Sequence, residues 1–125
     1  SLSAFFAIPF KSLYSSTKAF VVNFSRALKS ELKETNISVS VVCPNGVRTN
    51  NGTFARIDSH GAKGKLTSVP VEEVARLTVD QSLNKKFLII PGRINRGLII
   101  LKKLMPDFLE QRLLYKEFHK EVKVS

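Results

Sequence analysis

Residues 12–33, SLYSSTKAFVVNFSRALKSELK, predict one long helix, and the neighbouring segments follow from it. Apolar side chains recur there at steps of three and four residues, the spacing of a single helix face. We therefore expect a helix over residues 13–34, capped by Ser12, with one buried stripe. The stripe consists of Leu13, Val21, Phe24, Leu28 and Leu32.

Tyr14 and Lys18 stand four residues apart on this helix, within the peptide Tyr14-Ser15-Ser16-Thr17-Lys18. Side chains at that spacing are neighbours on one face, about 5–6 Å apart at Cβ. A free phenol loses its proton at about pH 10, and a nearby lysine ammonium lowers the pKa of a phenol toward neutral pH. The pair is therefore suited to pass a proton to or from a substrate oxygen. The alternative is an ordinary surface pair, because tyrosine and lysine meet at this spacing by chance on many helices.

The segment after the helix predicts a strand that ends in a polar turn. Thr35-Asn36 breaks the helix, and residues 37–43 are rich in β-branched side chains, which favour strands. A helix followed by such a strand is one step of a parallel βαβ unit. Ligands bind at the carboxyl ends of the strands in sheets of this kind. The peptide Pro44-Asn45-Gly46-Val47-Arg48-Thr49 occupies that position.

Further elements alternate along the rest of the chain. Residues 69–84 predict a helix with acids in its first turn, and residues 87–90 predict a short buried strand. Residues 1–10 predict the end of a strand passing into a loop, because Pro9 bars a regular helix there. Residues 50–68 predict a long polar loop, either a lid over a ligand or merely a mobile insertion.

Two segments in residues 93–125, separated at Pro106, mix apolar with basic side chains at helical spacing. Such basic amphipathic helices lie on membranes or dock on partner subunits, and many simply pack on a core. Both interpretations stay open at this point.

Ser1 lies thirteen residues before Tyr14, Pro9 lies five before it, and residues 44–49 follow the next strand. This order and spacing resembles the short-chain dehydrogenase/reductase (SDR) family, in its S…Y-x-x-x-K catalytic segment and the P-G-x-V-x-T segment behind it. The resemblance covers roughly residues 1–92. It implies an α/β fold with a Rossmann-like doubly wound parallel sheet, of which only the C-terminal half is present. Family members are about twice as long, and the Gly-rich dinucleotide fingerprint of their N-terminal half does not occur in this sequence.

On this resemblance, residues 1–92 are the C-terminal half of a dehydrogenase domain, with the catalytic segment, substrate loop and last strands, and residues 93–125 are a basic amphipathic helical extension. Tyr14 is then the general acid and base, Lys18 assists it, and Ser1 donates a hydrogen bond to the substrate oxygen.

The resemblance also implies NAD or NADP as cofactor and a small carbonyl or alcohol substrate. The residues implied in cofactor binding are Tyr14, Lys18, Pro44, Asn45, Gly46, Val47 and Thr49. Asn45 departs from the family pattern, which has glycine there, but asparagine tolerates positive φ better than most residues. Because the nucleotide fingerprint is missing, we expect the isolated chain to be inactive, and we expect the family's usual homodimer or homotetramer.

Twenty basic and ten acidic residues give a net charge of +10, which by itself suggests nucleic acid or an anionic membrane as partner. The charge is spread along the chain and no zinc-finger or RNA-binding motif accompanies it, so we expect no nucleic-acid binding but keep peripheral membrane contact open. The single cysteine, Cys43, cannot form an internal disulfide, and no run of apolar residues is long enough to span a bilayer. These features predict a cytoplasmic protein. His60 and His119 lack metal-ligand spacing, so no metal site is expected.

The sequence thus favours an NAD(P)-dependent oxidoreductase. The alternatives are a non-catalytic relative of the family and a basic module that binds a membrane or a partner protein.

Overall fold

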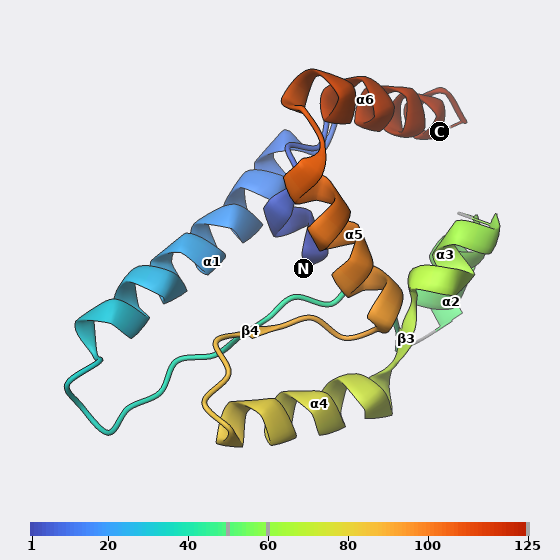
Figure 1. Ribbon diagram of the computed structural model, residues 1–125. Coiled ribbons are helices and arrows are strands. Elements are labelled where there is room, and N and C mark those ends of the chain that lie inside the picture. Colours follow the sequence, from blue (N-terminus) through green and yellow to red (C-terminus); the bar gives the residue numbers. More distant parts are fainter. Residues whose placement is uncertain (50, 60, 125) are drawn as a thin grey trace.

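The computed structural model describes residues 1–49, 51–59 and 61–124 (Figure 1). Six α-helices, one short 3-10 helix and four two-residue strands make up this part of the chain. In chain order they are η1 (Leu2–Phe5), α1 (Ser12–Glu31), β1 (Val41–Val42), β2 (Val47–Arg48), α2 (Asn51–Ser59), α3 (Gly61–Thr67), β3 (Val69–Pro70), α4 (Val71–Leu83), β4 (Leu88–Ile89), α5 (Arg93–Leu104) and α6 (Asp107–Val124).

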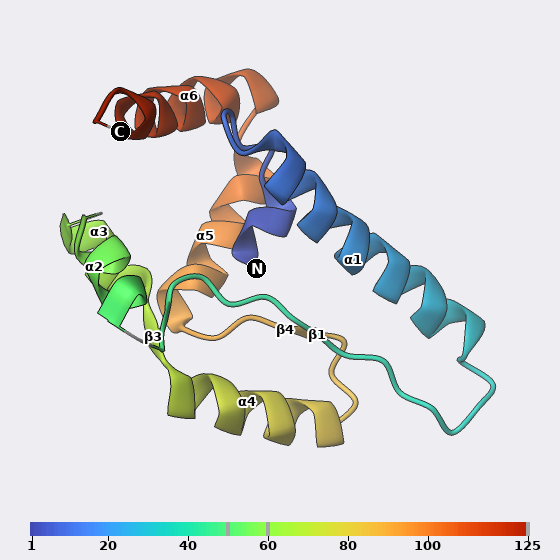
Figure 2. The ribbon, with the colours of Figure 1, turned by 180° about the vertical axis from the view of Figure 1, so that it is seen from behind.

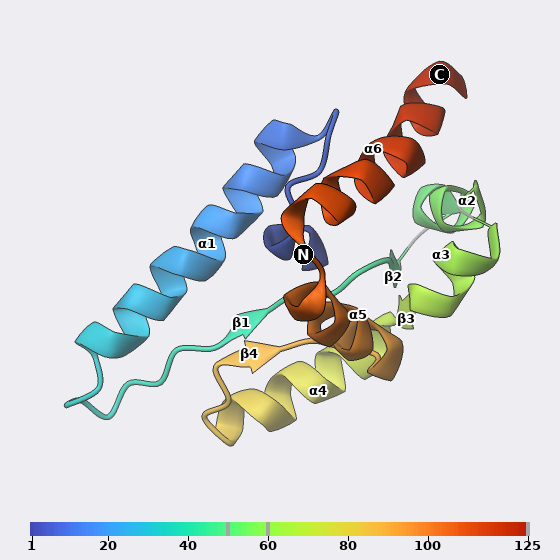
Figure 3. The same cartoon turned by 45° about the horizontal axis from the view of Figure 1, so that its top comes forward.

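The strands form two parallel pairs. β1 pairs with β4 with Val41 opposite Leu88, and β2 pairs with β3 with Val47 opposite Val69. α1 and α4 lie on opposite sides of the β1–β4 pair (Figures 1 and 3). The parallel pairing and the helix–strand–helix layering confirm the α/β class. The expected doubly wound sheet is present only as these short pairs, and most of the described chain is helical.

A small apolar core holds α1 against β1. Val22 of α1 packs with Val41 and Cys43, and the three are almost fully buried. Partly buried hydrophobic residues surround them, namely Ala4, Phe5, Phe87, Leu88 and Ile90. The backbone N–H of Cys43 continues the ladder by donating to the Ile89 carbonyl at 2.8 Å. This core fixes the end of β1. The segment predicted as a turn over residues 44–49 departs from there and includes strand β2 at Val47–Arg48.

The predicted helix over residues 13–34 is confirmed by α1, but its predicted buried stripe is wrong. Leu13 is 79% exposed and Phe24 58% exposed, whereas Val22 is 5% exposed. Helical spacing shows that apolar side chains share a face, but a face is buried only where another segment covers it. Among the residues that the structure describes, the sheet covers α1 chiefly at Val22, so the neighbouring apolar face stays open. Ser12 is the first helical residue, and Lys11 holds the cap position without a side-chain hydrogen bond.

Two segments contain helices that the sequence did not predict. Residues 1–10 contain η1 instead of a strand end, with the Ser1 hydroxyl accepting a hydrogen bond from the Ser3 N–H. The loop predicted over residues 50–68 contains α2 and α3, and positions 50 and 60 of that prediction lie outside the described residues. Ile57 of α2 is only 7% exposed and packs beside Gly46. That contact between distant segments is not visible in the local hydrophobic pattern.

The two helices predicted in residues 93–125 are confirmed as α5 and α6. They meet at Pro106, and α6 lies at the end of the molecule away from α4 (Figures 1 and 2). Within the described residues, no helix combines the length and apolar character needed to cross a bilayer.

Candidate active site

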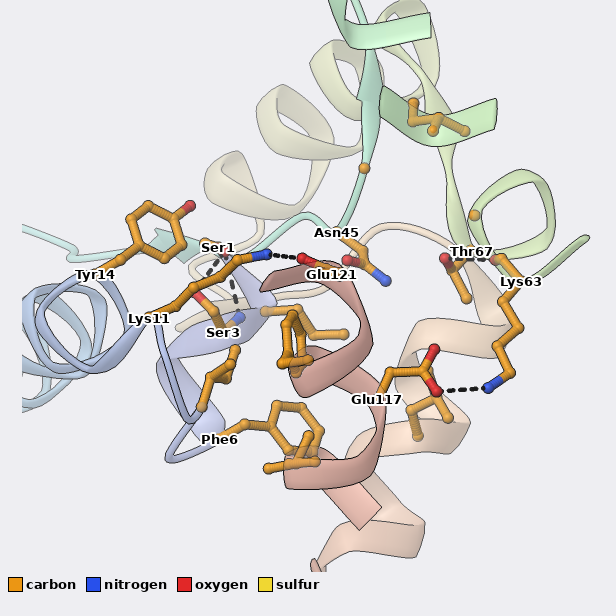
Figure 4. Close-up of a pocket in the computed structure, with 18 of the residues that line it drawn as sticks. Ser1, Ser3, Phe6, Lys11, Tyr14, Asn45, Lys63, Thr67, Glu117 and Glu121 are labelled. Atoms are coloured by element: carbon orange, nitrogen blue, oxygen red, sulfur yellow. Dashed lines mark hydrogen bonds and ion pairs between the residues drawn. The ribbon is translucent and has the colours of Figure 1, made fainter. Parts of the chain in front are cut away.

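A cavity of about 510 Å³ collects residues from both ends of the chain. Figure 4 shows Tyr14 and Lys63 on opposite sides of it, with Ser1 and Asn45 between them. Five of the predicted site residues line it, namely Ser1, Tyr14, Asn45, Gly46 and Val47. Lys18, Pro44 and Thr49 are not among its lining residues.

Ser1 is held in place by the first turn of the chain. Its Oγ lies 2.8 Å from the Ser3 Oγ and accepts the Ser3 N–H at 3.2 Å. The N–H of Leu2 donates to the Pro44 carbonyl at 2.8 Å, which ties this turn to the end of β1. The hydroxyl of Ser1 therefore stands beside the predicted cofactor turn.

Tyr14 and Lys18 occupy successive turns near the start of α1. The Lys18 Nζ lies 5.4 Å from the centre of the Tyr14 ring, close enough for the charge to act on the ring. Tyr14 is 49% exposed, and its backbone carbonyl accepts the Thr17 hydroxyl at 2.8 Å. The predicted neighbouring placement of the two side chains is thus observed, with the ammonium facing the ring.

The turn that follows β1 is packed closely against α2 and β3. A Cβ at Gly46 would lie 3.3 Å from Ile57 Cγ1, so a larger residue there would crowd α2. The Gly46 carbonyl accepts the Val69 N–H at 2.9 Å. Phe10 and Lys85 are the non-glycine residues of the described chain with positive φ, so Asn45 does not need the left-handed conformation. The departure from the family's glycine at this position therefore strains nothing.

Thr49 lies beyond the cavity. Its Oγ1 is 3.2 Å from the Thr53 Oγ1, and Thr53 itself lines the cavity. Beneath the turn, Cys43 is 1% exposed, and burial raises the pKa of its thiol. A protonated, buried thiol is a poor nucleophile, so Cys43 serves as packing below the site.

Asn95 of α5 is a site-supporting residue that sequence reasoning missed. It is 1% exposed, and its Nδ2 donates to the Thr67 and Pro91 carbonyls at 2.9 Å each. Its Oδ1 accepts the Asn45 Nδ2 at 3.3 Å. One side chain therefore joins three segments around the turn. Its position in the sequence could have indicated its burial, because it stands four residues before Ile99, which is buried on the same face of the helix.

The helix α6 forms the remaining wall of the cavity. Its Glu117 and Glu121 pair with Lys63 at 3.2 Å and with Lys11 at 2.7 Å. Apolar side chains from the start of the chain, α5 and α6 complete the lining, including Phe6, Leu98, Leu114 and Phe118. The cavity thus has paired charges at its rim and apolar residues inside. Such a lining suits a ligand with an apolar body and a polar reacting group.

Sequence comparisons with known proteins match part of this chain. The family model described as "short chain dehydrogenase" matches residues 1–59, a range that includes every predicted site residue. Dehydrogenase/reductase SDR family member 7B from Mus musculus is 34% identical over 91 residues, which cover 69% of this chain and 28% of the mouse protein. The chain therefore spans less than a third of that relative's length. No solved structure gave a significant match. From the motif spacing, the family model and the curated relative together, this chain belongs to the short-chain dehydrogenase/reductase family, over part of that family's length.

Proposed function

We propose that the protein containing this chain is an NAD(P)-dependent oxidoreductase that transfers a hydride between a nicotinamide cofactor and a carbonyl or alcohol substrate. The family as a whole is an oxidoreductase family whose members generally use NAD or NADP. The observation that carries the proposal is that Ser1, Tyr14 and the residues Asn45, Gly46 and Val47 after β1 line the same cavity. These residues come from three separate segments, and only folding brings them together.

In this proposal Tyr14 manages the proton of the substrate oxygen. Its hydroxyl gives the proton during reduction and takes it during oxidation. The Lys18 ammonium lies 5.4 Å from the ring centre, beside the phenol that moves the proton. The Ser1 hydroxyl donates a hydrogen bond to the same oxygen, while the Ser3 hydroxyl, 2.8 Å away, keeps it oriented.

The residues on the cavity wall fit the nicotinamide end of a dinucleotide. Backbone groups of Val47 and the side chain of Asn45 would hold the carboxamide, and Lys18 would bind the ribose. Pro44 and Thr49 would position this turn from outside the cavity. The close packing of Gly46 against Ile57 supports this role, because it leaves the backbone of the turn little freedom to move. When bound, the cofactor would supply the hydride in reduction and accept it in oxidation.

A Tyr14→Phe substitution in the whole protein tests this assignment. It removes only the hydroxyl, so we expect kcat to fall by roughly 100- to 10,000-fold with nucleotide affinity nearly unchanged. Tyr115→Phe is the matched control, because Tyr115 stacks on His119 outside the cavity lining. Carbonyl reduction would be followed with NADH and NADPH, and nucleotide Kd by titration.

The runner-up is a non-catalytic relative that binds an apolar ligand in the same cavity. The apolar lining from Phe6, Leu114 and Phe118 favours ligand binding with or without chemistry. If Tyr14→Phe keeps most of its turnover, the role assigned to Tyr14 is wrong. If the unmodified protein binds a nucleotide without turning over any carbonyl compound tested, this second function replaces the first.

A further inference from the structure

The charges of α6 are segregated between its two faces. Glu110, which is buried, and Glu117 and Glu121, which line the cavity, pair with lysines of α5, α3 and residue 11 at 2.7–3.2 Å. The cations of α6 are all exposed, and they are Arg112, Lys116, Lys120 and Lys123. Among the residues that the structure describes, none of these four cations has an ion-pair partner. The outer face of α6 therefore carries unneutralised positive charge.

Exposed apolar side chains lie within this cationic face. Leu109, Leu113, Lys116 and Lys120 follow one another at steps of three and four residues, so they form a single stripe along the helix. Leu113 is 50% exposed. At the corner between α5 and α6, Leu104 is 80% exposed and Phe108 76% exposed. Leucine and phenylalanine side chains this open to water are costly unless a partner covers them.

We propose that the outer face of α6, together with the corner at Leu104 and Phe108, binds the surface of an anionic lipid bilayer. This inference does not depend on the proposed catalytic function. The cations attract acidic headgroups, and the apolar side chains enter the boundary between headgroups and acyl chains. Nucleic acid would use the cations but would leave the leucines exposed to water, so the mixed stripe favours lipid.

The position of α6 allows a flat surface to approach it. Figures 1 and 2 show α6 at one end of the molecule, with α4 and the end of α1 at the other. Its inner face closes the cavity with Leu114 and Phe118. Docking through the outer face would therefore leave the ion pairs of Glu117 and Glu121 in place.

Cosedimentation with vesicles tests the electrostatic part of the proposal. The triple variant Arg112→Gln, Lys116→Gln, Lys120→Gln is compared with a control of equal charge change, Lys33→Gln, Arg76→Gln, Lys86→Gln, all at exposed positions. With vesicles of phosphatidylcholine and phosphatidylserine, each α6 cation should contribute about fivefold in affinity, so the α6 triple variant loses about 100-fold. The control should lose less than about threefold, because charges beyond a Debye length from the membrane are screened. Equal losses in both variants would overturn the proposal.

A fluorescent reporter tests the apolar part. The sequence contains no tryptophan, so Leu113→Trp introduces a single probe, and Val79→Trp on α4 is its control at 61% exposure. Phosphatidylserine vesicles should shift the emission of Leu113→Trp to shorter wavelength and leave that of Val79→Trp unchanged. An unshifted Leu113→Trp emission on vesicle-bound protein, or equally tight binding to single-stranded RNA, would overturn the lipid assignment in favour of a general polyanion site.

Discussion

Replacing Asn95 removes the side chain that joins Asn45 to Pro91, which follows β4, and to Thr67 at the end of α3. Asn95→Ala leaves the Pro91 carbonyl buried without its donor and the partly buried Thr67 carbonyl with only partial access to water. An unsatisfied buried polar group costs about 1–3 kcal/mol. Taking about 2 kcal/mol for Pro91 and about 1 for Thr67, we expect the free energy of unfolding to fall by about 3 kcal/mol. For a chain of this length that corresponds to a decrease of about 10 °C in Tm.

Urea and thermal unfolding followed by far-ultraviolet circular dichroism measure this loss. Asn84→Ala is the control, because the Asn84 amide also donates to a backbone carbonyl, that of Asp80 at 2.8 Å, but at an exposed position. We expect its cost to stay within about 0.5 kcal/mol. Asn95→Asp keeps the size but places an acceptor against two carbonyl oxygens, so it should destabilise at least as much as alanine. Equal stabilities of Asn95→Ala and Asn84→Ala, or an Asn95→Asp variant as stable as the natural chain, would refute the reasoning.

Three further changes test the packing around the site. Val22→Ala should lower the free energy of unfolding by about 1–2 kcal/mol and Leu13→Ala by less than about 0.5 kcal/mol, because only Val22 is buried. If chemical denaturation finds the opposite order, the buried stripe predicted from sequence is correct after all. Gly46→Val should lower the stability of the fold by about 1–3 kcal/mol, because even a Cβ at this position would lie 3.3 Å from Ile57. A thermal shift assay that finds no decrease in Tm would contradict that packing. Burial raises the pKa of the Cys43 thiol, so its contribution to stability is present below the unfolded-state pKa and is lost as pH rises through the folded-state value. Iodoacetamide at mildly alkaline pH should therefore modify Cys43 only after denaturant is added, and rapid labelling of the folded chain would count against its burial.

The cavity and the outer surface of α6 explain how the excess positive charge is distributed. Lys11 and Lys63 are paired at the cavity rim, whereas Arg112, Lys116, Lys120 and Lys123 project from the opposite face of α6. Net charge alone suggested nucleic acid and an anionic membrane equally as binding partners. Only the positions of the leucines among these cations favour a bilayer.

Local patterns in the sequence predicted several features of this protein that the structure contains. The long helix α1, the spacing of Tyr14 and Lys18, the turn after β1 and the helices α5 and α6 all follow from periodicity, breakers and motif order. These features depend on residues within a few positions of one another, so their pattern is readable along the chain. The family resemblance extended this to the roles of Ser1, Tyr14 and Lys18, which stay predictions until the variants are measured.

Tertiary structure alone decided which faces are covered and which residues share the cavity. Lys11 and Glu121 are 110 positions apart in the sequence and form one ion pair. The Leu2 N–H donates a hydrogen bond to the Pro44 carbonyl. Asn95 likewise forms two of its three hydrogen bonds with Asn45 and Thr67, in segments that no local pattern connects with it. The physical reason is that burial and pairing are properties of surfaces brought together by folding. Periodicity shows only that Leu13 and Phe24 share a face of α1, and the rest of the fold determines that this face remains exposed while Val22 is buried.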